Sequence, residues 1–148
     1  MKMQVLKIFS MLLLAVTPAA AAVSATLDGA LKATIPFEFS VGDKTLPAGV
    51  YTVASTTTPG MLRIRGEESH AGVLIPARDV QNRRPQGRSN LTFRRYGDRY
   101  FLAQIWTERM SNGRELWKSR TERELIKSKS ENLAKSAMEP EVVYIAAQ

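Results

Sequence analysis

Residues 90–106 read NLTFRRYGDRYFLAQIW and carry the clearest fold signal in the chain. Two runs rich in aromatic and aliphatic residues flank Gly97-Asp98, and a two-residue loop that begins with glycine is typical of a type II′ β-hairpin. Because the loop length fixes which residues lie opposite one another, the sequence predicts a register. The predicted pairs are Tyr96 with Arg99, Arg95 with Tyr100, Phe93 with Leu102, and Leu91 with Gln104.

The two faces of this hairpin are predicted to differ. The face toward the core carries Leu91, Phe93, Tyr100, Leu102 and Trp106. The opposite face carries Thr92, Arg94, Tyr96, Arg99, Phe101 and Ala103. On that face the register puts Arg94 beside Phe101, so we expect the guanidinium to stack on the ring.

The rest of the chain also favours strands. Residues 31–41 alternate apolar and polar side chains, which predicts one half-buried strand, and Pro36 places that strand at an edge or at a bulge because proline has no N–H. Further strands are expected at residues 50–54, 61–65, 69–77 and 141–146. Residues 78–89 lack any apolar period and are predicted to be a loop. About eight strands with short turns indicate a mainly β fold, a small antiparallel barrel or sandwich.

One helix is expected near the C-terminus. Ser119 and Thr121 each stand three residues before a glutamate, which is the spacing of a capping box, and they predict a helix over about residues 119–137. Its apolar stripe is narrow, so the helix should lie on the surface of the domain. The stripe consists of Leu125, Ile126, Leu133 and Ala137.

The first 25 residues have the pattern of a signal peptide. Lys2 and Lys7 precede an apolar segment over residues 8–16, and small residues follow up to Ala25. We therefore expect a single domain over residues 26–148 that is exported to the periplasm or secreted. No later segment reaches about 18 apolar residues, so no transmembrane span is expected in the mature chain.

The composition excludes several classes of site. The chain has no cysteine and one histidine, which excludes disulfide frameworks, thiolate zinc sites, cysteine nucleophiles and multi-histidine metal sites. His70 is expected in a strand, and the sequence places no acid or nucleophile beside it. We expect no catalytic residue, no metal and no cofactor, and therefore a non-enzymatic exported domain with a structural or binding role.

Positive charge is concentrated in one region. The chain has 21 Lys and Arg against 14 Asp and Glu, and the segment from Arg78 to Arg99 holds seven arginines and two acidic residues. A planar guanidinium can pair with phosphate or carboxylate through two hydrogen bonds. One alternative function is thus binding of an anionic polymer (polysaccharide, lipid head group or nucleic acid), with another exported protein as a further possible partner. The candidate anion-binding residues are Arg83, Arg84, Arg88, Arg94, Arg95 and Arg99.

A second alternative is a carrier for a small apolar ligand. A small barrel either fills its interior with side chains or holds one small ligand. A carrier predicts a cavity of a few hundred Å³, whereas a structural domain predicts a filled core. The side chains that would line the cavity or fill the core are Phe37, Phe39, Tyr51, Phe93, Tyr100 and Trp106.

Three segments resemble a known family. They are IPFEFSVGDKTLPAGVYTV at residues 35–53, RRYGDRYFLAQIW at 94–106 and GRELWKSRTERELIK at 113–127. Together they resemble small exported, uncharacterised proteins of soil bacteria that share a PFxFxVG…LPAGxY pattern. The resemblance covers most of residues 34–127 and departs from the family at Trp117, where we expect proline. It implies a β-rich secreted domain and no particular activity.

Overall fold

The computed structural model describes residues 30–132 and 139–148. The predicted signal peptide at residues 1–25, and the part of the predicted helix at 133–137, lie outside these ranges. The described elements are β1 (Leu31–Ile35), β2 (Phe39–Val41), β3 (Lys44–Leu46), β4 (Gly49–Ser55), β5 (Met61–Gly66), β6 (Gly72–Pro76), β7 (Arg78–Gln81), β8 (Asn90–Tyr96), β9 (Arg99–Trp106), β10 (Asn112–Glu115), α1 (Arg120–Asn132) and β11 (Glu141–Ala146). The mainly β class with one helix near the C-terminus is confirmed.

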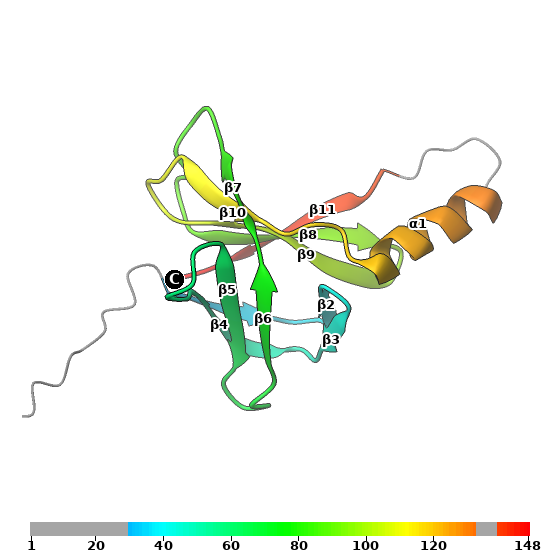
Figure 1. The fold of residues 1–148 in the computed structure, drawn as a ribbon, viewed down its shortest axis with the longest axis horizontal. Coiled ribbons are helices and arrows are strands. Elements are labelled where there is room, and N and C mark those ends of the chain that lie inside the picture. The colour runs from blue at the N-terminus through cyan, green and yellow to red at the C-terminus, as the bar shows by residue number, and fades with distance from the viewer. Residues whose placement is uncertain (1–29, 133–138) are drawn as a thin grey trace, which may run out of the picture.

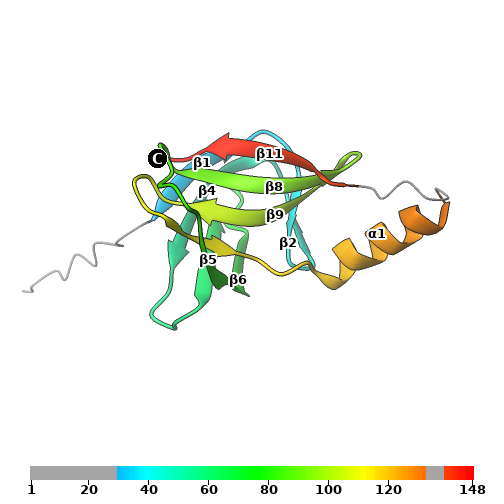
Figure 2. The ribbon, with the colours of Figure 1, turned by 90° about the horizontal axis from the view of Figure 1, so that it is seen from above.

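The strands form two sheets that pack as an open sandwich rather than a closed barrel (Figure 1). One sheet has the order β1-β4-β5-β6, and the other has the order β11-β8-β9-β10-β7. Figure 2 shows β11, β8 and β9 side by side across the second sheet. Along one side the sheets meet through main-chain hydrogen bonds, from the Lys32 N–H to the Gln148 carbonyl at 2.7 Å and from the Gln148 N–H back to the Lys32 carbonyl at 2.9 Å.

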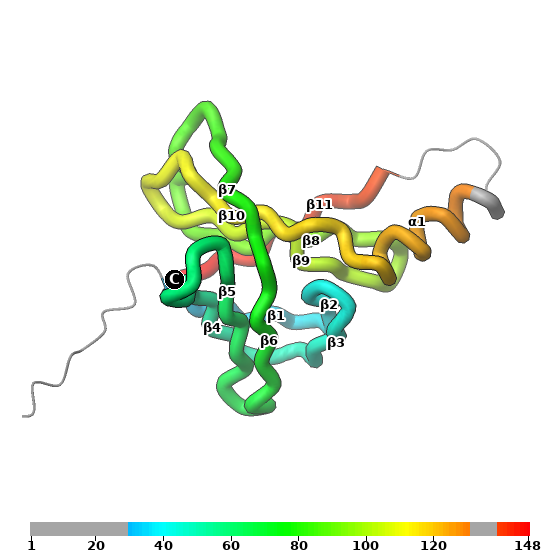
Figure 3. Tube along the Cα trace, viewed as in Figure 1, coloured from blue at the N-terminus to red at the C-terminus, as the bar shows by residue number. Residues whose placement is uncertain are grey.

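The alternating run over residues 31–41 forms two strands and not one. β1 pairs with β4 in the first sheet, whereas β2 pairs in parallel with β9 in the second. Figure 3 traces the chain as it passes from β1 to β2. The break falls at Pro36, which cannot donate a ladder hydrogen bond. The alternation is preserved because both halves turn their apolar side chains toward the same core.

The hairpin register is confirmed near its turn and is wrong further away. Gly97 has φ of 69°, and the pairs closest to the turn form as expected. Leu91, however, lies opposite Ile105 and not Gln104, because the register shifts between Thr92 and Phe93. β9 therefore holds one extra residue, Ala103, and this is a β-bulge.

After the bulge, the residues of β9 that face the core are the opposite set from the predicted one. Ile105 belongs to the buried apolar cluster between the sheets. Trp106, which was expected on the core face, lies on the other face. Its ring packs against Gly113, where an added Cβ would come within 2.6 Å of it. A larger residue at position 113 would therefore overlap the indole.

Two further expectations are corrected. The first residues of the predicted loop 78–89 form β7, which pairs with β10 and so becomes an edge of the second sheet. The predicted strand over residues 69–77 begins only at Gly72. His70 lies in the preceding turn with φ of 51°, a conformation that a strand residue does not adopt.

Candidate functional site

A buried ion pair joins helix α1 to the second sheet. The Glu122 carboxylate accepts hydrogen bonds from Arg94 Nε at 2.6 Å and Arg94 Nη2 at 3.0 Å, and from the Tyr96 hydroxyl at 3.0 Å. Glu122 is 1% exposed and the Arg94 side chain is 13% exposed. The expected stack of Arg94 on Phe101 is therefore wrong, since this guanidinium is held by Glu122.

The start of α1 explains why Glu122 points inward. Ser119 caps the helix as predicted, because its hydroxyl accepts the Glu122 N–H at 3.1 Å. The reciprocal half of the capping box is not formed, because the carboxylate of Glu122 binds the sheet instead. Thr121 donates both its N–H and its hydroxyl to Asp43 at 3.0 Å. These hydrogen bonds hold the pKa of Asp43 below its usual value.

The anchor of α1 is a structural feature rather than a reactive one. Burial, together with the negative charge of Glu122, raises the pKa of Tyr96 to about 12, so this hydroxyl stays protonated and keeps donating. Beyond its first turn the helix extends away from the sandwich (Figures 1 and 2). We refer to Arg94, Tyr96 and Glu122 as the helix anchor.

The other two hairpin arginines also have partners within the domain. Arg95 donates to the Gly97 carbonyl at 2.7 Å and to Glu141 at 3.1 Å, and its guanidinium lies 5.4 Å from the centre of the Tyr100 ring. Arg99 lies over Phe101 at 5.5 Å. The guanidinium of Arg95 is thus already paired, whereas Arg99 is exposed and has no carboxylate partner among the described residues.

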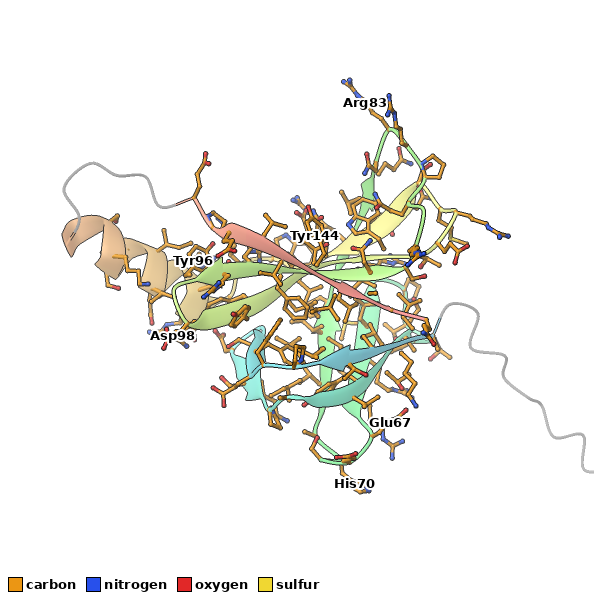
Figure 4. The ribbon with its side chains drawn as sticks, turned by 180° about the vertical axis from the view of Figure 1, so that it is seen from behind. Glu67, His70, Arg83, Tyr96, Asp98 and Tyr144 are labelled. Atoms are coloured by element: carbon orange, nitrogen blue, oxygen red, sulfur yellow. The ribbon has the colours of Figure 1, made fainter. Side chains whose placement is uncertain are left out.

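The remaining three candidates lie on the loop between β7 and β8. Arg83, Arg84 and Arg88 are exposed, and none of them contacts a carboxylate of the described residues. Figure 4 shows Arg83 at the tip of this loop, at the opposite end of the sheet from Asp98. β8 has seven residues, so about 20 Å of strand separates the loop from the hairpin turn. The six candidate arginines therefore form two groups and not one patch.

The arginine loop, defined as residues 82–89, is hydrogen-bonded to a second loop that joins β9 to β10. The Asn82 N–H donates to the Ser111 carbonyl at 2.8 Å, and the Arg109 N–H donates to the Gln86 carbonyl at 2.9 Å. The Gln86 N–H returns a bond to Met110 at 3.2 Å. The two loops are thus held together as one unit.

An open cleft of about 430 Å³ lies at this same end of the sandwich. Its floor is formed by core side chains from both sheets, namely Leu31, Val53, Leu62 and Ile105, each of which is at most 5% exposed. Met110 and Ser55 line its mouth, together with the ion pair between Asp79 and Arg114. No single segment of sequence marks this cleft, because its residues come from six strands and a loop.

Five of the six residues that the sequence predicts as cavity lining or core pack against one another, and the sixth, Trp106, lies against Gly113 on the other face. Phe37 stacks on Tyr100 with ring centres 3.9 Å apart, and Phe39 meets Tyr51 and Phe93 edge to face at 5.0 and 5.5 Å. The cleft of about 430 Å³ lies at the end of the sandwich, and a smaller, mainly polar pocket of about 250 Å³ lies beside Phe39 and Tyr100.

His70 shows no catalytic arrangement. It is exposed in a turn, and its Nδ1 lies 3.0 Å from the Glu68 carbonyl. Within residues 30–132 and 139–148, no three His, Asp or Glu side chains come together in a way that would hold a metal ion.

Compared with protein-family models, with curated proteins and with solved structures, the chain matches none of them. The resemblance of residues 34–127 to a family of exported proteins therefore stays a prediction. In the part of the chain that the structure describes, no helix is long and apolar enough to cross a membrane.

Proposed function

We propose that this chain is an exported, non-catalytic domain that binds a small apolar ligand in the cleft at the end of its β-sandwich. Export is supported by the pattern of residues 1–25, with the periplasm or the extracellular medium as the destination. Ligand binding is supported by the cleft itself. The resemblance to small exported proteins agrees with the first part, export.

The observation that carries the proposal is the chemistry of the cleft floor. Its volume of about 430 Å³ falls within the usual range of 300–1,000 Å³ for small-molecule sites. Apolar side chains line the cleft from its nearly buried floor to Met110 at the mouth, which is 56% exposed, and an apolar ligand would cover them and remove the exposed part from water. Polar groups stand only at the mouth, where they can orient a ligand without being desolvated.

The first test is to block the cleft. Ser55 is exposed at the end of β4 and lines the mouth, so Ser55→Trp should fill it. Thr57→Trp is the matched control, since Thr57 is exposed in the loop that follows β4 but does not line the cleft. The mature protein is titrated with the neutral apolar probe N-phenyl-1-naphthylamine. The wild type and the control should bind it saturably with one site, and Ser55→Trp should weaken binding at least tenfold.

A second measurement looks for the natural ligand. Native mass spectrometry of the wild type, purified from an exporting host, should show an extra mass that disappears on denaturation. The Ser55→Trp variant should lack this mass. Saturable probe binding that is identical in all three proteins, or no binding to any of them, contradicts the proposal.

The arginine loop supports a second candidate function, the binding of an anionic polymer. Arg83, Arg84 and Arg88 lie together on one loop, are exposed, and pair with no carboxylate of the described residues. Replacing all three by alanine should flatten the salt dependence of binding to a single-stranded oligonucleotide, by about 2 in the slope of log K against log salt. Arg63, Arg65 and Arg123 are likewise exposed and outside any described ion pair, so their triple alanine variant is the charge-matched control. Equal slopes in both variants argue against this function.

A further inference from the structure

We infer that the ligand of the cleft is an anionic amphiphile, a single apolar chain that carries a carboxylate or phosphate head. This inference rests on the proposed function, because it names the ligand class of the same cleft. It adds a role for the arginine loop, which would bind the head while the cleft floor covers the chain.

The first support is the way the loop is attached. Met110 lines the mouth of the cleft, and its carbonyl accepts the Gln86 N–H from the arginine loop. Asn112, also at the mouth, pairs with Gln81 at the end of β7, directly before that loop. The arginine loop therefore begins at the mouth of the cleft, and its middle is hydrogen-bonded to the loop that carries Met110.

The second support is the charge left over at this end of the molecule. Arg114 is paired with Asp79, and Arg109 is paired with Glu108 at 3.2 Å. In each of these two pairs the charges of the arginine and of its acidic partner cancel. The three loop arginines have no such partner in the described residues, so this end of the molecule keeps an excess of positive charge. An anionic head placed there would gain charge-assisted hydrogen bonds from guanidinium groups.

The combination of these features fits an amphiphile better than either simpler ligand. A neutral apolar molecule would use the floor and leave the arginines unpaired. A charged polymer would use the arginines and leave the cleft, with the exposed side chain of Met110 at its mouth, uncovered. A ligand with both parts uses both surfaces, and the open mouth lets its head stay partly hydrated, which avoids the cost of burying a charge.

The test compares two ligands of equal chain length. Decanoate and decanol compete with N-phenyl-1-naphthylamine at low salt, and partition into apolar surroundings alone would favour the alcohol. The wild type should bind decanoate at least tenfold more tightly than decanol. The triple variant of Arg83, Arg84 and Arg88 to alanine should lose this preference and keep its affinity for decanol. The triple variant of Arg63, Arg65 and Arg123 should keep the preference, and Ser55→Trp should bind neither ligand.

The outcomes separate this inference from the proposed function. Equal affinity for the two ligands, or tighter binding of decanol, overturns the inference and leaves an apolar carrier. Failure of both ligands and of the probe to bind overturns both. A loop variant that loses oligonucleotide binding but still prefers decanoate also overturns the inference, because the arginines would then serve a polymer.

Discussion

Removing the carboxylate of Glu122 should be one of the most costly single changes in this protein. Glu122→Met keeps a helix-forming side chain of similar length but leaves Arg94 and the Tyr96 hydroxyl without their acceptor. Removing one partner of a buried pair typically costs 3–5 kcal/mol. Arg94 keeps 13% of its side chain exposed and can regain some hydration, so we expect about 3 kcal/mol. That is a large part of the 5–15 kcal/mol that usually stabilises a domain.

Replacing both charges should cost less than replacing one. In Arg94→Met with Glu122→Met, the only polar group left without its partner is the Tyr96 hydroxyl, which costs about 1 kcal/mol. The loss of stability in the double variant should therefore be smaller than the sum of the two single losses by about 2 kcal/mol or more, as expected for residues in direct contact. Urea unfolding of the four proteins, followed by circular dichroism, measures the free energies of unfolding.

The control for this cycle lies two residues further along the helix. Glu124 pairs with Arg120, but both side chains are well exposed, at 63% and 80%. Glu124→Met should change the stability little, because exposed ion pairs contribute little. A cost below about 1 kcal/mol for Glu122→Met, or additive effects of the two anchor substitutions, would refute the reasoning.

Three further changes have expected outcomes. Because the pKa of Tyr96 is about 12 in the folded protein and about 10 when unfolded, stability should fall as pH rises from 10 to 12, and Tyr96→Phe should reduce this fall by about 2 kcal/mol in urea unfolding. The pKa of Asp43 is lower in the folded protein than in the unfolded chain, so its carboxylate stabilises the fold at pH values above the unfolded pKa. This stabilisation is lost as the pH falls through the folded pKa. Asp43→Asn should therefore weaken the acid dependence of unfolding and speed amide exchange at Thr121. Gly113→Ala should cost about 1–3 kcal/mol by overlap with the Trp106 ring, and Trp106→Leu in the same chain should relieve most of it in thermal unfolding.

The sequence predicts the hairpin turn well because turn chemistry is local. Gly97 and its neighbours fix the pairs closest to the loop, and those pairs are confirmed. The bulge at Ala103 depends on a distant residue, since the Ala103 carbonyl accepts the Leu116 N–H at 2.8 Å. No pattern within residues 90–106 contains that information. For this reason the predicted assignment of β9 side chains to the two faces of the hairpin is correct up to Leu102 and wrong at Trp106.

The candidate site was predictable only in part. Clustering of arginines in the sequence selects six residues, but it does not tell a free guanidinium from one with a carboxylate partner. Arg94 and Glu122 are 28 positions apart, and only the packing of α1 brings them together. The cleft was not predictable from motifs, because its floor combines Leu31 with residues from three other strands. Its apolar residues are those that a filled core would also require.

The helix anchor and the cleft lie at opposite ends of the second sheet, and this separation predicts that they act independently. Ile105 of the cleft floor lies opposite Leu91, three residues from Arg94, so about 10 Å of strand lies between the two sites. Effects of residues this far apart normally add. Glu122→Met should therefore lower the free energy of unfolding while leaving the Kd for decanoate within about twofold at a temperature where the variant is folded. A large loss of affinity would mean that α1 shapes the cleft, and the proposed division between a structural end and a binding end would be wrong.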